Sequence, residues 1–401
     1  MTRINEPFKK MIGFQEAIKQ IVVCAQPLGT EWVQLNEALS RVLAEDVVYD
    51  INMPPFNKSA MDGYACAKAD LYEELTLVDT IYAGKNEVPS LKQKQCVKIM
   101  TGAPIPLGAD MVFMQEDALI KSDGKVVCQN KDSKENVCYL GEDIKKGDVV
   151  VAQNTKLQAR HLPLLAGAGY DQVKVFIQPK INIITTGTEL VEPKETPQSH
   201  QIRNSNASQI IAQLNELGIP HNYQGIIEDD EDSLKTMIKE SLLQSNVLVM
   251  SGGVSVGEFD LVPDILNDLG FTIPIDKTAI QPGKPMVFAH CNGKYIFGLS
   301  GNPVASFIQF ELYVKPFLFA LQGSVYKPLR FQLPISTSFK RKKSVRHMFV
   351  PAQILDSNEI KPLKFNGSAN IGALAYADCL MEVPIGVDRI EENTMVYIRP
   401  L

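Results

Sequence analysis

The sequence predicts a multidomain protein of α/β and β structure, built around a central, doubly wound, parallel-type α/β domain. Three observations support this prediction. The chain has 401 residues, more than one hydrophobic core usually serves, so several domains are expected. Short apolar runs alternate with amphipathic helical stretches between residues 180 and 323, which is typical of a parallel sheet with helices on both faces. Stretches of short strands with frequent glycine and proline flank this region.

Composition narrows the class of protein. Hydrophobic content of 45% and charged content of 21% are ordinary for a globular chain. The net charge of −6 gives no electrostatic signal for nucleic acid, and no apolar run approaches the ~20 residues of a membrane span. The seven cysteines are scattered and form no CxxC pair, which fits a reducing compartment. We therefore expect a cytoplasmic protein that binds neither nucleic acid nor membrane.

The N-terminal third divides into two predicted domains. Apolar residues at positions 14, 17, 18, 21 and 22 follow helical spacing, so the first ~45 residues are expected to be helical. Residues 1–46 and 150–179 are assigned to an N-terminal helical and connecting domain, with a short helix expected over 158–168. Residues 47–149 are assigned to an inserted, mostly-β domain. Its expected strands cover 77–82, 96–100, 111–114 and 125–129, and a further strand at 149–151 ends it.

Residues 180–326 are assigned to the α/β domain, and residues 327–401 to a small C-terminal β domain. Asn292-Gly293 predicts a tight turn between two antiparallel strands. Pro303 favours the start of a long helix. The expected strands of the α/β domain cover 181–185, 224–227, 246–250, 286–289 and 295–299, and the expected helices cover 205–217, 232–243, 261–269 and 303–321.

Polar glycine loops follow three of these strands. The longest is Ser251-Gly-Gly-Val-Ser-Val-Gly-Glu-Phe-Asp260, and the others are Thr185–Leu190 and Ser300–Pro303. In an open α/β sheet such loops share the edge where ligands bind, and bare backbone N–H groups there favour anions. Carboxylates do not touch a phosphate directly, but they hold a divalent cation that does.

Four acids are candidates for that cation. Glu189, one of Asp229 and Asp230, and Asp260 are predicted to gather around one Mg²⁺. The alternative is that each acid caps the helix that follows it. This alternative is strongest for Asp229 and Asp230, and for Glu189 and Asp260 the neighbouring glycines favour function.

Basic residues supply a second group of candidates. Gln281-Pro-Gly-Lys-Pro285 holds Lys284 in a rigid turn, where its ammonium suits an anionic ligand. The run Lys340–Lys343 with Arg346 is explained either as a charged loop or edge strand that resists aggregation, or as a source of one anion-neutralising residue, chiefly Arg346.

Seven segments, taken in their order along the chain, resemble the molybdopterin molybdotransferases of the bacterial MoeA type, a family related to the C-terminal domain of gephyrin. The resemblance runs from about residue 10 to the C-terminus. The segments are Pro55–Tyr64, Thr101–Pro104, Gly141–Ile144, Thr186–Leu190, Ser251–Gly257, Pro282–Pro285 and Gly301–Pro303.

The resemblance implies four domains and an elongated homodimer. It also implies a reaction in which adenylylated molybdopterin and molybdate give molybdenum cofactor and AMP with Mg²⁺, together with transient contact with the molybdopterin adenylyltransferase. The active cleft of the family lies between the β domain of one subunit and the α/β and C-terminal domains of the other. This implies that Asp62 and Thr101 face the glycine loops of a partner chain.

The resemblance also implies roles for individual residues. The catalytic residues would be Asp62, Thr101, Asp260 and Lys284; the substrate-binding residues Ser255, Gly252, Gly253, Gly301, Asn302, Arg346 and Ser368; and the metal-binding residues Glu189, Asp229, Asp230 and Asp260. Among these, Ser255, Lys284, Arg346 and Ser368 correspond to the molybdate pocket.

The chain departs from the family pattern around that pocket. Gln281 stands where the family usually has lysine, Ser300 where it usually has proline, and Ala305 where it usually has serine. Pro351 also stands where an arginine is frequent. Two alternatives therefore stay open, a relative that only cleaves a nucleotide pyrophosphate and a non-enzymatic scaffold of the gephyrin kind.

Overall fold

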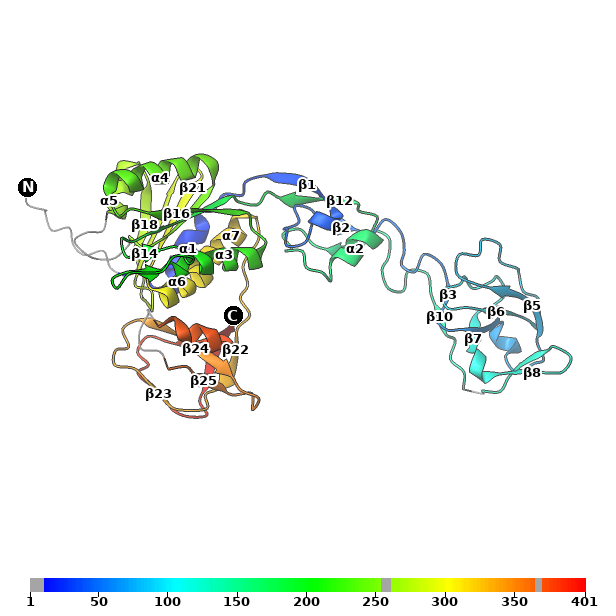
Figure 1. Ribbon diagram of the computed structural model, residues 1–401. Helices are drawn as coiled ribbons and strands as arrows, with labels where there is room; N and C mark the ends of the chain where they lie inside the picture. Colours follow the sequence, from blue (N-terminus) through cyan, green and yellow to red (C-terminus); the bar gives the residue numbers. More distant parts are fainter. Residues whose placement is uncertain (1–10, 131, 254–260, 365–369) are drawn as a thin grey trace, which may run out of the picture.

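A computed structural model describes residues 11–130, 132–253, 261–364 and 370–401. The molecule is elongated: the α/β domain and the C-terminal β domain lie together at one end, a small connecting domain lies in the middle, and the mostly-β domain lies at the other end (Figure 1). The multidomain architecture predicted from the sequence is thus confirmed.

A six-stranded sheet forms the centre of the α/β domain, in the order β16-β13-β17-β21-β20-β18. Neighbours among β16, β13, β17 and β21 run parallel, whereas β20 pairs antiparallel with both β21 and β18. The expected hairpin turn is present, with Asn292 and Gly293 at φ values of 46° and 73°. The strands are β13 (Ile181–Thr186), β16 (His221–Ile227), β17 (Val247–Ser251), β18 (Thr272–Lys277), β20 (Pro285–Cys291) and β21 (Lys294–Leu299).

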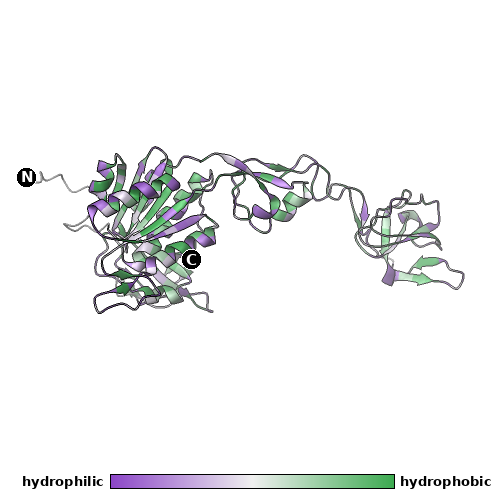
Figure 2. Cartoon of the chain, turned by 45° about the horizontal axis from the view of Figure 1, so that its top comes forward, coloured by the Kyte–Doolittle hydropathy of each residue, from purple (hydrophilic) through white to green (hydrophobic). Residues whose placement is uncertain are grey.

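Helices cover both faces of this sheet, as a doubly wound fold requires. On one face α3 (Ser205–Leu217) packs with α6 (Pro303–Gln309), and on the other α4 (Glu231–Gln244) packs with α5 (Val262–Asp268). Two separate apolar clusters fill the two faces. Figure 2 shows hydrophobic strands between helices that carry hydrophobic and hydrophilic residues alike.

The long predicted helix over 303–321 is present with a break in its hydrogen-bond pattern. A π-helical turn over Phe310–Val314 separates α6 from α7 (Lys315–Leu321). Pro316 follows this turn, and since proline lacks an N–H, a regular helix could not continue through it unchanged. Within the described ranges this helix alone is long and apolar enough to meet the criteria for a membrane span, and most of it is buried inside the domain.

The first 46 residues are not wholly helical, contrary to the sequence-based expectation. One helix, α1 (Phe14–Val23), buries Phe14, Ala17 and Ile21 in the core of the α/β domain. The chain then forms β1 (Thr30–Gln34), which pairs antiparallel with β12 (Gln172–Phe176). The helical spacing correctly predicted α1 alone. Strand β1 was missed because its partner β12 lies more than a hundred residues away in the sequence.

The connecting domain also contains the pair β2 (Val47–Val48) and β11 (Val149–Val151), and α2 (Leu162–Gly167).

The mostly-β domain has a four-stranded sheet in the order β5-β6-β4-β7 and two small two-stranded sheets. Its strands are β3 (Lys58–Ser59), β4 (Gly63–Cys66), β5 (Thr76–Ile81), β6 (Gln95–Ile99), β7 (Met111–Met114), β8 (Ala118–Ile120), β9 (Val126–Cys128) and β10 (Val137–Cys138).

A second six-stranded sheet, β19-β24-β26-β28-β22 with β25 alongside β24, forms the C-terminal domain. Its edge strand β19 (Ile280–Gln281) comes from the α/β domain and pairs parallel with β24, which fastens the two domains together. The other elements are β22 (Phe331–Pro334), β23 (Phe339–Lys340), β24 (His347–Ile354), β25 (Ile360–Pro362), β26 (Cys379–Val383), β27 (Arg389–Ile390) and β28 (Met395–Pro400).

Candidate active site

A cavity of about 450 Å³ lies where the glycine loops meet at the carboxyl edge of the central sheet. The ends of β13, β17 and β21 and the first turns of α3 and α6 form its walls. The predicted residues that line it together are Glu189, Asp229, Gly252, Gly253, Gly301 and Asn302. The sheet therefore brings these loops to one edge, as the order of strands requires.

The structure separates the roles of the two adjacent aspartates. Asp229 lines the cavity, and its Oδ1 accepts a hydrogen bond of 3.1 Å from the Thr186 hydroxyl. Asp230 instead caps α4, where its Oδ1 accepts a 3.0 Å hydrogen bond from the Ser233 N–H. Hydrogen bonds from Ser233 hold the pKa of Asp230 below its ordinary value. Asp229 is thus the better candidate ligand, and Asp230 fits the capping alternative.

Two glycines allow the backbone to approach the cavity closely. Gly252 has a φ of 96°, and a Cβ at this position would lie 2.2 Å from the Thr186 carbonyl oxygen. Gly253 has a φ of 66°, and its Cβ would lie 3.0 Å from the Thr186 hydroxyl and 3.7 Å from the Asp229 Oδ1. A side chain at position 252 would require the backbone at Thr186 to move, and one at position 253 would strain the backbone and press on the Thr186 side chain.

Buried amides that the sequence analysis missed connect the cavity walls. The Asn206 Nδ2 donates to the Ser251 Oγ and to the Gly301 carbonyl oxygen, both at 2.8 Å. Asn204 caps α3 through its Oδ1, while its Nδ2 donates to the Tyr223 hydroxyl at 2.7 Å. Burial raises the pKa of Tyr223 to about 12. Asn204, which directly precedes the predicted helix over 205–217, was the available signal, since asparagine favours N-caps.

The turn that carries Lys284 lies against the C-terminal domain. Thr278 anchors it, because the Thr278 N–H donates to the Lys284 carbonyl oxygen at 2.9 Å and the Thr278 hydroxyl donates to the Gly283 carbonyl oxygen at 3.0 Å. The Arg346 guanidinium donates to the Ile280 carbonyl oxygen at 3.1 Å. Arg346 thus directly precedes β24, and Lys284 lies in the turn that follows β19, so both belong to segments next to the β19–β24 pairing. Burial lowers the pKa of the Arg346 guanidinium.

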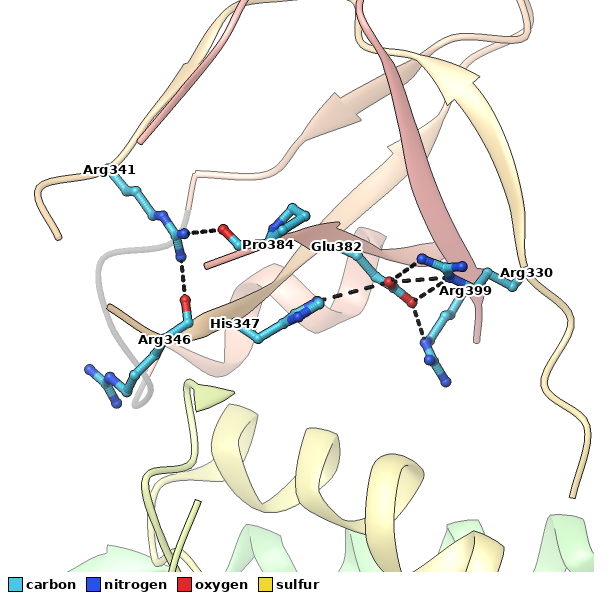
Figure 3. Close-up of polar contacts among 7 residues, drawn as sticks. All are labelled: Arg330, Arg341, Arg346, His347, Glu382, Pro384 and Arg399. Atoms are coloured by element: carbon cyan, nitrogen blue, oxygen red, sulfur yellow. Dashed lines mark hydrogen bonds and ion pairs between the residues drawn. The ribbon is translucent and has the colours of Figure 1, made fainter. Parts of the chain in front are cut away.

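Arg341 fixes the backbone at Arg346, and two other arginines surround Glu382 nearby (Figure 3). Arg341 donates to the Arg346 carbonyl oxygen at 2.8 Å and to the Pro384 carbonyl oxygen at 2.6 Å. Within the basic run, Arg341 is therefore a structural residue that positions Arg346. Beside it, Glu382 accepts hydrogen bonds from Arg330 and Arg399, and the His347 Nε2 lies 3.9 Å from the Glu382 Oε2.

Asp62 and Thr101 form a separate pair on the mostly-β domain. The Asp62 Oδ1 accepts hydrogen bonds from both the backbone N–H and the hydroxyl of Thr101, each at 2.7 Å. These bonds hold the pKa of Asp62 below its ordinary value, so the exposed carboxylate stays charged. Because this domain and the cavity lie at opposite ends of the molecule (Figure 1), one chain does not bring the pair to its own cavity.

Three predicted site residues, Ser255, Asp260 and Ser368, lie outside the described residues, as does Glu258. In the part of the chain that the structure describes, no group of three or more His, Cys, Asp or Glu side chains forms a ready metal site. The cavity instead offers two carboxylates, those of Glu189 and Asp229.

Family models match three consecutive parts of the chain. The "MoeA N-terminal region (domain I and II)" matches residues 12–169, the "Probable molybdopterin binding domain" matches residues 182–320, and the "MoeA C-terminal region (domain IV)" matches residues 333–401. The cavity, the glycine loops and Lys284 all lie in the second of these, and Asp62 and Thr101 lie in the first.

Curated relatives and solved structures agree with the family models. The chain is 38% identical over 403 residues to a Bacillus subtilis molybdopterin molybdenumtransferase, covering 96% of this chain and 93% of the relative. It is 34% identical over 385 residues to a Staphylococcus aureus protein of the same name, covering 94% and 92%. A crystal structure of a molybdopterin biosynthesis moeA protein from Pyrococcus horikoshii OT3 matches with a TM-score of 0.83 and 27% identity, covering 98% of this chain and 100% of the other.

Proposed function

The chain belongs to the MoeA family of molybdopterin molybdenumtransferases, and from this we propose that it inserts molybdate into adenylylated molybdopterin in a Mg²⁺-dependent reaction that releases AMP and molybdenum cofactor. Membership makes it a transferase of molybdenum cofactor biosynthesis. The magnesium, the adenylylated form of the substrate and the release of AMP belong to the proposal.

The observation that carries the proposal is the pairing of two carboxylates with three glycine loops in one cavity. Bare backbone at Gly252 and Gly253 suits a phosphate, whereas Glu189 and Asp229 repel one. A divalent cation resolves this conflict, because Mg²⁺ is commonly held by one or two carboxylates together with substrate phosphates. The oxygen donors present fit this ion. Bound there, it would draw negative charge from the phosphoanhydride.

Different residues of the chain would bind the cation, the molybdopterin and the molybdate. Glu189 and Asp229 would hold the cation, and the backbone at Gly252, Gly253 and Gly301 would hold the molybdopterin phosphate and pterin. Lys284 and Arg346 carry the positive charge that a molybdate dianion requires, and both belong to segments next to the β19–β24 pairing. Ser255, Asp260 and Ser368 join these groups through the family resemblance alone. No protein nucleophile is needed, because an oxygen of water or of molybdate can attack the phosphoanhydride, whose cleavage releases AMP.

A homodimer is the second part of the proposal. Asp62 and Thr101 match the family motif, yet they lie far from the cavity of their own chain. A second copy of the chain, placed so that its mostly-β domain covers this cavity, would supply them. A transient contact with the adenylyltransferase that makes the substrate, and a cytoplasmic location, complete the proposal. All seven cysteines are free thiols, which agrees with a reducing compartment.

The direct test is a reconstituted assay. Purified protein is incubated with adenylylated molybdopterin, Mg²⁺ and molybdate, and both AMP and molybdenum cofactor are measured. We expect both products in equal amounts and neither after Mg²⁺ is removed with EDTA. AMP without cofactor would support the pyrophosphate-cleaving alternative. Neither product from a folded preparation would favour the scaffold alternative.

A further inference from the structure

Gln309 is a buried glutamine that touches both halves of the site without lining the cavity. It is fully buried at the end of α6, immediately before the π-helical turn. Its Oε1 accepts a hydrogen bond of 2.8 Å from the Ser300 N–H. Its Nε2 donates to the carbonyl oxygens of Gly283 at 3.0 Å and Pro285 at 2.6 Å. The chemistry of the partners sets the orientation of the amide, since an N–H must face the oxygen and two carbonyls must face the nitrogen.

The three partners belong to the two loops that the proposed function needs. Ser300 begins the loop that carries Gly301 and Asn302, and Ser300 and Pro285 both line the cavity. Gly283 and Pro285 flank Lys284 on either side. The Gln309 side chain therefore connects the loop that carries Gly301 and Asn302 to the turn that carries Lys284.

The fit around Gln309 is close. A Cβ on Gly283 would lie 3.0 to 3.2 Å from the Cγ, Cδ and Nε2 atoms of Gln309, and Gly283 has a φ of 102°. A larger residue at position 283 would push the amide away from its partners. The glycine of the Gln-Pro-Gly-Lys-Pro motif is thus explained by contact with Gln309 as well as by its backbone conformation.

Gln309 also accounts for one departure from the family pattern. Ser300 stands where the family usually has proline, and unlike proline it carries a backbone N–H. At a buried position this donor needs a partner, because an unpaired buried N–H costs free energy. The Gln309 Oε1 is that partner.

We propose that Gln309 is a positioning residue that holds the Lys284 turn and the Gly301 loop at a fixed separation, so that the oxyanion and the pterin are presented to each other in one geometry. This inference rests on the proposed function for its catalytic meaning. Its structural content, the coupling of two loops by one amide, is independent of that function.

The first experiment measures the coupling without any substrate. Hydrogen exchange is followed by mass spectrometry in wild type, Gln309→Met and a control, Gln322→Met. Gln322 is a buried glutamine at the C-cap of α7, and its Nε2 donates to the Leu318 carbonyl oxygen. We expect exchange about tenfold faster over residues 282–286 and 300–303 in Gln309→Met, as loss of a buried hydrogen bond implies, and wild-type exchange there in the control. Unchanged exchange in both segments would overturn the proposal.

The second experiment separates positioning from general stability. In Gln309→Met we expect kcat/KM for molybdate to fall about tenfold, through a raised KM, whereas Gln322→Met keeps the wild-type value. Adding Ser300→Pro removes the unpaired N–H and should restore slow exchange at Gly301, whereas the Asn302 N–H loses its Ser300 Oγ acceptor and should stay fast. The molybdate KM should stay raised, because the Lys284 turn still lacks its hydrogen bonds to the Gln309 amide. A lowered Tm with a wild-type molybdate KM would show that Gln309 supports only the fold.

Two further outcomes are distinguishable. If the wild-type protein shows no turnover, the proposed function fails and the exchange experiment still decides the coupling. If Gln309→Met does not fold, Gln309→Asn, which stays polar and removes one methylene, is measured with the same expectations and the same overturning result.

Discussion

The Thr186 hydroxyl donates a 3.1 Å hydrogen bond to the Asp229 carboxylate, and this contact joins the ends of the parallel neighbours β13 and β16. The Thr186 carbonyl oxygen is also the atom nearest to the Cβ that Gly252 lacks. One threonine thus lies against both the acid and the glycine loop, and it fixes how far the two are apart.

Replacing the two adjacent aspartates in turn tests their different roles. Asp229→Ala should lower turnover about 100-fold, because the proposed cation loses a ligand, and should leave the Tm near the wild-type value. Asp230→Ala should lower the Tm by a few degrees through the lost helix cap and keep turnover. AMP release and thermal melting are measured on both. Equal losses of turnover would show that the cavity does not distinguish them.

Subunit complementation tests the shared cleft. Asp62→Asn and Asp229→Asn should each be inactive alone, and their co-expression should restore roughly a quarter of wild-type activity. Half of randomly mixed dimers would be heterodimers, and each heterodimer would carry one site free of both changes. Differently tagged chains allow the heterodimer to be purified. Activity that stays absent in the purified heterodimer would contradict a site shared between subunits.

Gly252→Ala tests the close approach of the backbone. The added Cβ would meet the Thr186 carbonyl oxygen, so the free energy of unfolding should fall by about 2 kcal/mol or more. Gly293→Ala is the control, because Gly293 also has a positive φ but has open space around it. This substitution should lower the free energy of unfolding by about 1 kcal/mol. Urea unfolding measures both. If the two costs are the same, the clash with Thr186 is not significant.

The stability of the C-terminal domain should depend on pH through His347. Burial lowers the pKa of His347 below its ordinary value of 6.5; Glu382 opposes this shift, whereas Arg399, Arg341 and Arg330 add to it. Glu16 and Lys19 of α1 also line the shallow cavity beside it. The folded state therefore prefers the neutral ring, and stability should fall as the pH drops through about 6.5 and level off below the folded-state pKa.

His347→Phe keeps an aromatic ring against Phe14 and Phe349 and removes the titration. The free energy of unfolding, measured with urea between pH 8 and 5.5, should vary less with pH in this variant than in wild type. His200→Gln, at an exposed position, is the control and should keep the wild-type profile. A profile for His347→Phe that matches wild type would assign the pH dependence to another group.

Much of the α/β domain could be predicted from the spacing of apolar residues and from the residues that favour turns and helix ends. The helix over 205–217 matches α3, and the hairpin at Asn292-Gly293 is confirmed. These features depend on neighbours in the sequence, namely apolar periodicity, caps and turn residues. The meeting of the glycine loops at one edge also followed, because parallel strands end on the same side.

The rest depends on contacts that no local pattern encodes. Asp229 and Asp230 have the same side chain, and only the direction of the backbone at the start of α4 sends one to the cavity and the other to the cap. Gln309 lies in an apolar stretch, and its partners are 9 to 26 residues away. The pairing of β1 with β12 joins segments on either side of an inserted domain.

The distance between Asp62 and the cavity of its own chain has a consequence for concentration. If a second copy completes each site, the catalytic rate per chain depends on the fraction of chains that are dimeric, which is set by the protein concentration. It should fall when the protein is diluted below the dissociation constant of the dimer. Binding of molybdopterin, which the proposed function assigns to the α/β domain, should not fall in parallel. Dilution would thus separate substrate capture from chemistry.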